Sequence, residues 1–187
     1  VRALPRAFWV YAGFSAATML GFTTFGVLSF HLVERRIVTV ALVPVIYATA
    51  MAADAVAALA TGWMYDRRGA RVLVALPLLA ALVPVFAFQD AVIAVVIGAV
   101  LWGSAVGIQE STLRAVVADL VEPARRATAY GMYAAVIGVA AAAGGALTGL
   151  LYSQSVGALI AVVIAIQVAS LSVLPAVRRA ADSPGRV

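Results

Sequence analysis

Cysteine and lysine are absent from this sequence of 187 residues, and His31 is the only histidine. Without cysteine the chain can form no disulfide, no thiolate metal site and no cysteine nucleophile. A single imidazole supplies too few nitrogen ligands for a transition-metal cluster. We therefore expect neither a bound metal nor another cofactor.

Charge is also scarce, because only 11% of the residues are charged while 65% are hydrophobic, and the mean hydropathy is +1.07. Soluble domains carry about 25% charged residues, and so apolar a surface would aggregate in water. This balance excludes a soluble enzyme, a nucleic-acid binder and a disordered chain. The net charge of +5 fits basic loops beside membrane spans. The chain is therefore predicted to lie in a lipid bilayer.

Six apolar segments approach the roughly 20 residues that a spanning helix needs. They lie at about 7–32, 38–63, 72–88, 91–118, 127–152 and 155–177. The third is short and contains Pro77 and Pro84, which should kink it. Short linkers leave no room for a soluble domain. The predicted fold is all-α: a polytopic membrane protein with six transmembrane helices in a single bundle over 1–187.

Arginine counting predicts the orientation of these helices. One side would hold ten arginines and the other only Arg35 and Arg36. The ten are Arg2, Arg6, Arg67, Arg68, Arg71, Arg125, Arg126, Arg178, Arg179 and Arg186. Because positive charge marks the cytoplasmic side, both termini should be cytoplasmic, in a bacterial plasma (inner) membrane.

The segment Gly62-Trp63-Met64-Tyr65-Asp66-Arg67-Arg68-Gly69-Ala70-Arg71 joins the second and third expected helices. Gly69 permits a turn that a Cβ would resist. Asp66 is a lone acid among arginines, so it could accept their hydrogen bonds or face a helix N-terminus. A basic loop that only sets topology would explain the arginines, but not Asp66 and Gly69 at this spacing.

This segment resembles the loop motif of the major facilitator superfamily, G-x-x-x-D-R-x-G-R-R, and matches it at Gly62, Asp66, Arg67, Gly69 and Arg71. Ala70 replaces one of the two usual basic residues. Two further stretches look like parts of bacterial permeases of this superfamily. Residues 118–131 resemble the junction of the tenth and eleventh helices, and residues 4–9 resemble the entry to the seventh.

The resemblance implies the C-terminal six-helix half of a twelve-helix secondary transporter for a small-molecule substrate. It also implies that Asp66 clamps helices in the outward-facing state. The chain starts at Val1 without an initiator Met, so we expect a fragment or a lost first half. The expected partner is a second six-helix half, either that N-terminal half or a second protomer of a chain that dimerises.

Ionisable residues inside spans are the candidates for the transport cavity or for coupling, because a charge at mid-bilayer costs about 2.5–3.5 kcal/mol. Asp54 is in register with Tyr47 and Thr61, seven residues away on either side. Glu110 and Arg114 share a face of the fourth span with Gly103 and Gly107. Gln109 is a weaker candidate.

Several roles stay open for these charges. Asp54 and Glu110 would lie at matched depth, roughly 12–14 Å from the cytoplasmic ends of their spans at 1.5 Å per residue. Glu110 and Arg114 could form an internal ion pair, and Asp54 could pair with Arg114 across helices. Alternatively Asp54 carries a coupling proton, or contacts substrate.

The fifth span contains Gly131, Gly138 and Gly145 at intervals of seven, followed by Gly149. Small residues at this spacing let helix backbones approach closely, so tight packing is the first interpretation and a moving gate surface the second. His31, beside Glu34 and Arg35, is expected to be an interfacial anchor.

The sequence contains no Gly-x-Ser-x-Gly, histidine pair or acid cluster at membrane depth that an embedded enzyme would need. A non-transporting six-helix scaffold or interaction protein is the alternative function. Such a scaffold would keep its charges in loops, whereas Asp54, Glu110 and Arg114 lie inside spans. The favoured function is therefore half of a secondary active transporter that works by alternating access.

Overall fold

The computed structural model describes residues 4–181, and these residues form helices and no strand. The α-helices are α1 (Arg6–Leu20), α2 (Phe25–Glu34), α3 (Val43–Arg68), α4 (Ala75–Ala87), α5 (Val92–Leu120), α6 (Arg126–Gln154) and α7 (Val156–Ala181). Three short 3-10 helices join them: η1 (Val40–Leu42), η2 (Gly69–Val74) and η3 (Pro123–Arg125). The all-α prediction is confirmed. Arg2 and Arg186 of the arginine count lie outside the described residues.

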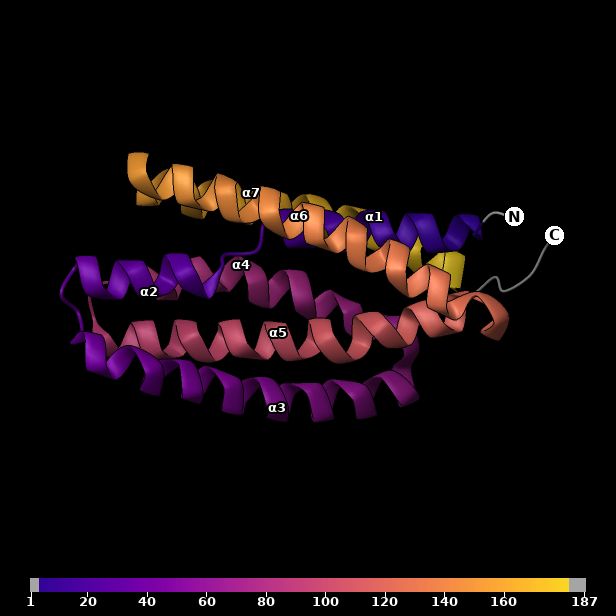
Figure 1. The fold of residues 1–187 in the computed structure, drawn as a ribbon, viewed down its shortest axis with the longest axis horizontal. Helices are drawn as coiled ribbons and strands as arrows, with labels where there is room; N and C mark the ends of the chain where they lie inside the picture. The colour runs from indigo at the N-terminus through magenta and orange to yellow at the C-terminus, as the bar shows by residue number, and fades with distance from the viewer. Residues whose placement is uncertain (1–3, 182–187) are drawn as a thin grey trace.

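Five helical stretches are long and apolar enough to cross a membrane. The stretch Val40–Ala87 has 48 residues and contains η2. Figure 1 shows the chain reversing direction there, so that α3 and α4 run opposite ways. The six expected segments correspond approximately to α1 with α2, α3, η2 with α4, α5, α6 and α7.

The first expected span, 7–32, corresponds to the membrane-length stretch Arg6–Glu34, but the helix is interrupted within it. Helix α1 ends at Leu20, and α2 begins at Phe25. The Thr24 side chain caps α2 by accepting a hydrogen bond from the Val27 amide at 3.4 Å. A threonine at this position favours the start of a new helix over continuation of the old one. The residues around it are apolar, so the hydropathy of the segment gives no sign of the interruption.

The linker expected at 64–71 is also largely helical. Helix α3 continues to Arg68, so that Asp66 and Arg67 lie in its last turn. Gly69 follows with φ +57°, a left-handed conformation that glycine adopts without strain. Similarly, residues 153–154 belong to α6, which ends only at Gln154.

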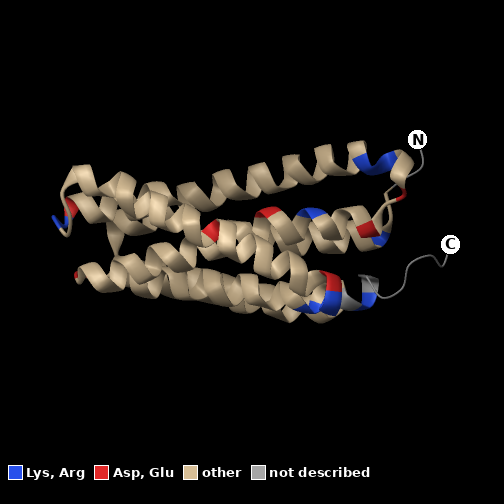
Figure 2. Ribbon diagram, turned by 90° about the horizontal axis from the view of Figure 1, so that it is seen from below, with Lys and Arg blue, Asp and Glu red and all other residues tan. Residues whose placement is uncertain are grey.

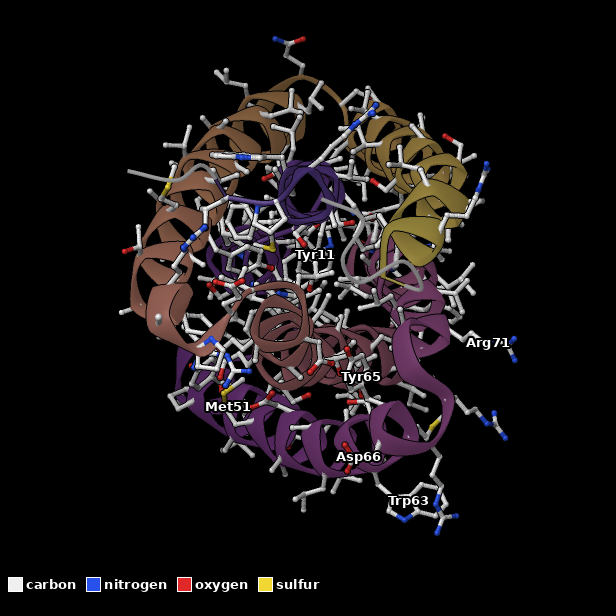
Figure 3. All side chains as sticks on the ribbon, turned by 90° about the vertical axis from the view of Figure 1, so that its right-hand side faces the viewer. Tyr11, Met51, Trp63, Tyr65, Asp66 and Arg71 are labelled. Atoms are coloured by element: carbon white, nitrogen blue, oxygen red, sulfur yellow. The ribbon has the colours of Figure 1, made fainter. Side chains whose placement is uncertain are left out.

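Helices α1 and α5 form the centre of the bundle. Seen from the end that carries the termini, they are surrounded by α3, α4, α6 and α7 (Figure 3). Their side chains supply many of the buried residues, whereas α6 buries few. Figure 2 shows most of the charged residues at the two ends of the bundle, with only a few in the middle of the helices. The two chain ends lie at the same end, as an even number of crossings requires (Figure 1).

Candidate functional site

The closest helix contact joins α3 to α5 through two glycines. A Cβ at Gly103 would overlap the Ala50 carbonyl, and one at Gly107 would overlap the Asp54 carbonyl. The backbones therefore meet directly. Glycine permits this approach, which is a principal packing device of helices in lipid.

The polar stripe predicted on the second span faces this contact. The Tyr47 ring lies 6.3 Å from the Trp102 ring of α5, and the Thr61 and Ser111 hydroxyl oxygens are 3.4 Å apart. Between them, the Asp54 backbone packs on Gly107. The three residues that share the seven-residue register thus lie on the side of α3 that faces α5.

Asp54 sits near the middle of α3, eleven residues after Val43. Its Oδ1 oxygen is buried and has no hydrogen-bond partner among residues 4–181. The Oδ1 oxygen lies 2.8 Å from the ideal Cβ position of Gly107, and Glu110 follows Gly107 by three residues on α5. An unpaired acid at this depth is costly to insert, which makes it a candidate for function rather than for packing.

Glu110 and Arg114 are both exposed on α5. Within the described part of the chain, neither the expected Glu110–Arg114 pair nor the expected Asp54–Arg114 pair forms. An exposed ion pair contributes little stabilising free energy, so nothing holds these side chains in contact. The Gln109 residue is half-buried, and its side chain makes no hydrogen bond to another described residue. Asp54 and Glu110 are thus brought close, while Arg114 stays separate.

A second polar feature, missed by the sequence analysis, surrounds the break between α1 and α2. Gln167 of α7 is fully buried, and its Nε2 donates to the Thr18 and Gly21 carbonyls, each at 2.9 Å. Trp102 Nε1 donates to the Thr23 carbonyl at 2.9 Å. In lipid every carbonyl freed by a helix break needs such a partner. The available signal was Gln167 itself, the one amide in a last span whose other polar residues are serines.

Aromatic rings cover the same break. The Phe25 ring lies 4.8 Å from that of Tyr47 and 5.2 Å from that of Trp102. Tyr47 is 43% exposed, so this cluster reaches the surface of the bundle. The break between α1 and α2 therefore contacts α3 and α5 through the aromatic cluster. Further along the same two helices lie Asp54 and Glu110.

The residues of the loop motif make other contacts than those predicted. Asp66 is exposed and makes no ion pair within the region that the structure covers, and Arg67 stacks 3.6 Å above the Trp63 ring. Tyr65 makes the link to α5 instead, because its hydroxyl donates to Asp119 Oδ2 at 2.7 Å. Figure 3 shows Tyr65 directed into the bundle, with Trp63 and Arg71 directed away from it.

Of the predicted glycine face of α6, only Gly145 packs against other described residues, since a Cβ there would lie 3.6 Å from Thr24 Cγ2. A Cβ at Gly131, Gly138 or Gly149 would meet no described atom within 4 Å. Gly144 makes the close contact instead, with the Leu20 carbonyl 2.6 Å from its ideal Cβ position. Tight packing of the predicted face therefore requires a partner outside the described chain.

His31, which was expected to be an interfacial anchor, is buried between helices. It is 1% exposed, and its Nδ1 lies 2.9 Å from the Tyr152 hydroxyl. Its ring packs edge-on against Phe88, with centroids 5.2 Å apart. Its neighbours Glu34 and Arg35 are exposed. The histidine thus joins α2 to the end of α6.

Comparison with known proteins gives a family and a set of longer relatives. The sequence model described as the Major Facilitator Superfamily matches residues 7–186. An uncharacterized protein of Mycobacterium bovis and one of Mycobacterium tuberculosis are each 59% identical over 176 residues. The match covers 94% of this chain but 43% of each relative. The chain thus spans less than half the length of the curated relatives it matches.

Proposed function

This chain belongs to the Major Facilitator Superfamily, and from that premise we propose that it is one half of a secondary transporter for a small solute. Transporters of this class bind solute near the bilayer midplane between two repeats and rock around it. The observation that carries the proposal is Asp54. Its unpaired carboxylate lies beside Glu110 at the middle of a span, where a scaffold gains nothing from a charge. We expect no catalysis and no cofactor.

The second half is the partner that this proposal requires. Relatives more than twice the matched length leave room for a second six-helix unit. The open glycine face of α6 supports a close helix contact with that unit. Asp66, exposed and unpaired within residues 4–181, would also find its clamp partner there. We place the termini of this half in the cytoplasm, because its arginines gather at their end.

Alternating access can be tested without knowing the solute. In the full-length protein with any other cysteines removed, single cysteines replace Glu110, Arg71 or Asp90. A membrane-impermeant maleimide should label Arg71→Cys only from the cytoplasm and Asp90→Cys only from outside. Glu110→Cys should react from either side, in separate conformations. Labelling of Glu110→Cys from one side alone would support the scaffold, and reversed labelling of the two controls would overturn the orientation.

Asp54 is the proposed coupling acid. Asp54→Asn should abolish proton-driven accumulation of a transported solute but preserve its exchange across proteoliposomes, because the neutral amide keeps the binding geometry. A structural lock predicts loss of folded protein instead, with rescue by adding Arg114→Gln. Since no Asp54–Arg114 pair forms between these described side chains, we expect no such rescue. Accumulation that survives Asp54→Asn would exclude the coupling role.

A further inference from the structure

A cavity of about 670 Å³ opens at the end of the bundle opposite the termini, between α2 and the junction of α6 with α7. Its wall is polar at one end and apolar at the other. Glu34, Arg35 and Ser153 lie at the outer ends of α2 and α6. Gly26 and Phe30 lie deeper, and Gly26 is eight residues before Glu34, or about 12 Å along the helix.

The floor of this cavity is fixed in place. Tyr152 lines it, and the tyrosine hydroxyl is held by buried His31 at 2.9 Å. The Phe30 ring meets Tyr152 edge-on with centroids 5.6 Å apart. Gly149, also in the lining, leaves open space where other residues would place a side chain. The wall is therefore formed before any ligand arrives.

Two opposite charges lie at the mouth without a salt bridge between described residues, and one of them, Arg35, lies next to the Tyr152 hydroxyl. Glu34 and Arg35 are both exposed, and neither forms an ion pair with any described residue. A guanidinium binds a phosphate through two parallel hydrogen bonds, and a carboxylate accepts hydrogen bonds from an ammonium group. The mouth therefore suits a ligand that carries a phosphate and a primary ammonium within a few ångströms of each other.

We propose that this cavity binds a zwitterionic phospholipid with a primary ammonium, phosphatidylethanolamine. Its phosphate lies on Arg35, its ammonium on Glu34, and the upper part of an acyl chain beside Phe30 and Gly26. Phosphatidylglycerol has no cation for Glu34. Phosphatidylcholine has no N–H to donate to it. The apolar depth of the cavity favours a lipid over a soluble phosphoethanolamine.

Such a lipid would act on the weakly held part of the fold. Helix α2 buries only Leu28, His31 and Leu32, and it follows the break after Leu20. A lipid that contacts both α2 and α6 would join them across the cavity. Binding should therefore fix the position of α2 relative to the rest of the bundle.

The experiment measures lipid binding to the delipidated full-length protein by native mass spectrometry. The probes are the ethanolamine, choline and glycerol phospholipids with identical acyl chains. We expect the ethanolamine lipid to bind several-fold more tightly than either of the others. Arg35→Gln should weaken it about tenfold, and Glu34→Gln should remove the preference for ethanolamine. Arg36→Gln is the matched control, because it removes the same charge one residue away and Arg36 is not in the cavity wall.

Four results would overturn the proposal. Equal loss in Arg36→Gln and Arg35→Gln would reveal general attraction to the basic end. Equal binding of the glycerol and ethanolamine lipids would remove the role of Glu34. Failure to retain any lipid would mean that another part of the protein covers the cavity. Competition by soluble phosphoethanolamine at the lipid's own concentration would assign a soluble ligand. None of these measurements depends on transport.

Discussion

The glycines of α5 and those of α6 each share one helix face but meet opposite surroundings. In α5, Gly103 and Gly107 lie four residues apart and press on the backbone of α3. In α6, Gly131 and Gly138 lie seven residues apart and face open space. Spacing decides which residues share a helix face, whereas the position of the helix in the bundle decides what that face meets. Helix α5 is central, and α6 lies on the outside.

The largest effect is expected at the packed face. Gly103→Val would place a branched side chain on the Ala50 carbonyl, where even a Cβ overlaps backbone atoms. Because backbone cannot move aside as a side-chain tip can, α3 and α5 would separate. We expect the free energy of unfolding to fall by about 3 kcal/mol or more. Thermal unfolding of the full-length protein in detergent measures this change.

Gly13→Val is the control for that substitution, since a Cβ at Gly13 of α1 meets no described atom within 4 Å and Gly13 lies outside the α6 face proposed to meet the second half. Most of the fall in unfolding free energy expected for Gly103→Val should be absent from the control variant. Equal losses would mean that valine in a helix, rather than the α3–α5 approach, causes the destabilisation.

A smaller effect is expected within α6 itself, where two adjacent glycines differ. A Cβ at Gly144 would lie 2.6 Å from the Leu20 carbonyl oxygen, whereas one at Gly145 would lie 3.6 Å from Thr24 Cγ2. Gly144→Ala should therefore cost about 1–3 kcal/mol. Gly145→Ala should be neutral or stabilising by up to about 1 kcal/mol, because alanine favours the helix. Comparison of their melting temperatures checks this, and a larger loss in Gly145→Ala would reverse our assignment of the packed face.

Apolar segment length predicted the helical architecture, because a chain that spans lipid must satisfy its backbone hydrogen bonds within helices. The seven-residue register predicted that Tyr47, Asp54 and Thr61 share one face, and the structure turns that face toward α5. The break after Leu20 could not be predicted in this way. Phe22 and Phe25 keep the segment apolar, and the hydrogen bonds that make the break tolerable come from Gln167, 146 positions after Gly21. Contacts over such separations depend on how the helices assemble.

The charged residues show the same limit. Helical spacing placed Glu110 and Arg114 one turn apart, but it did not decide whether they would pair, since exposure makes the pair weak. The motif from Gly62 to Arg71 likewise drew attention to Asp66. The link to α5 is made by Tyr65, whose partner Asp119 is distant in sequence.

The smallest effect on stability is expected at the open face of α6. A substitution there tests most directly whether the α6 glycines, like those of α5, pack against another helix. Gly138→Leu should change the free energy of unfolding by no more than about 1 kcal/mol, because leucine gains helix propensity and displaces no described atom. If the second half packs there, the same leucine should hold its helices apart and confine labelling of Glu110→Cys to one side of the membrane. Normal two-sided labelling in Gly138→Leu would show that this face meets lipid. Gly138 would then have no packing role, unlike Gly144 of the same helix and the glycines of α5.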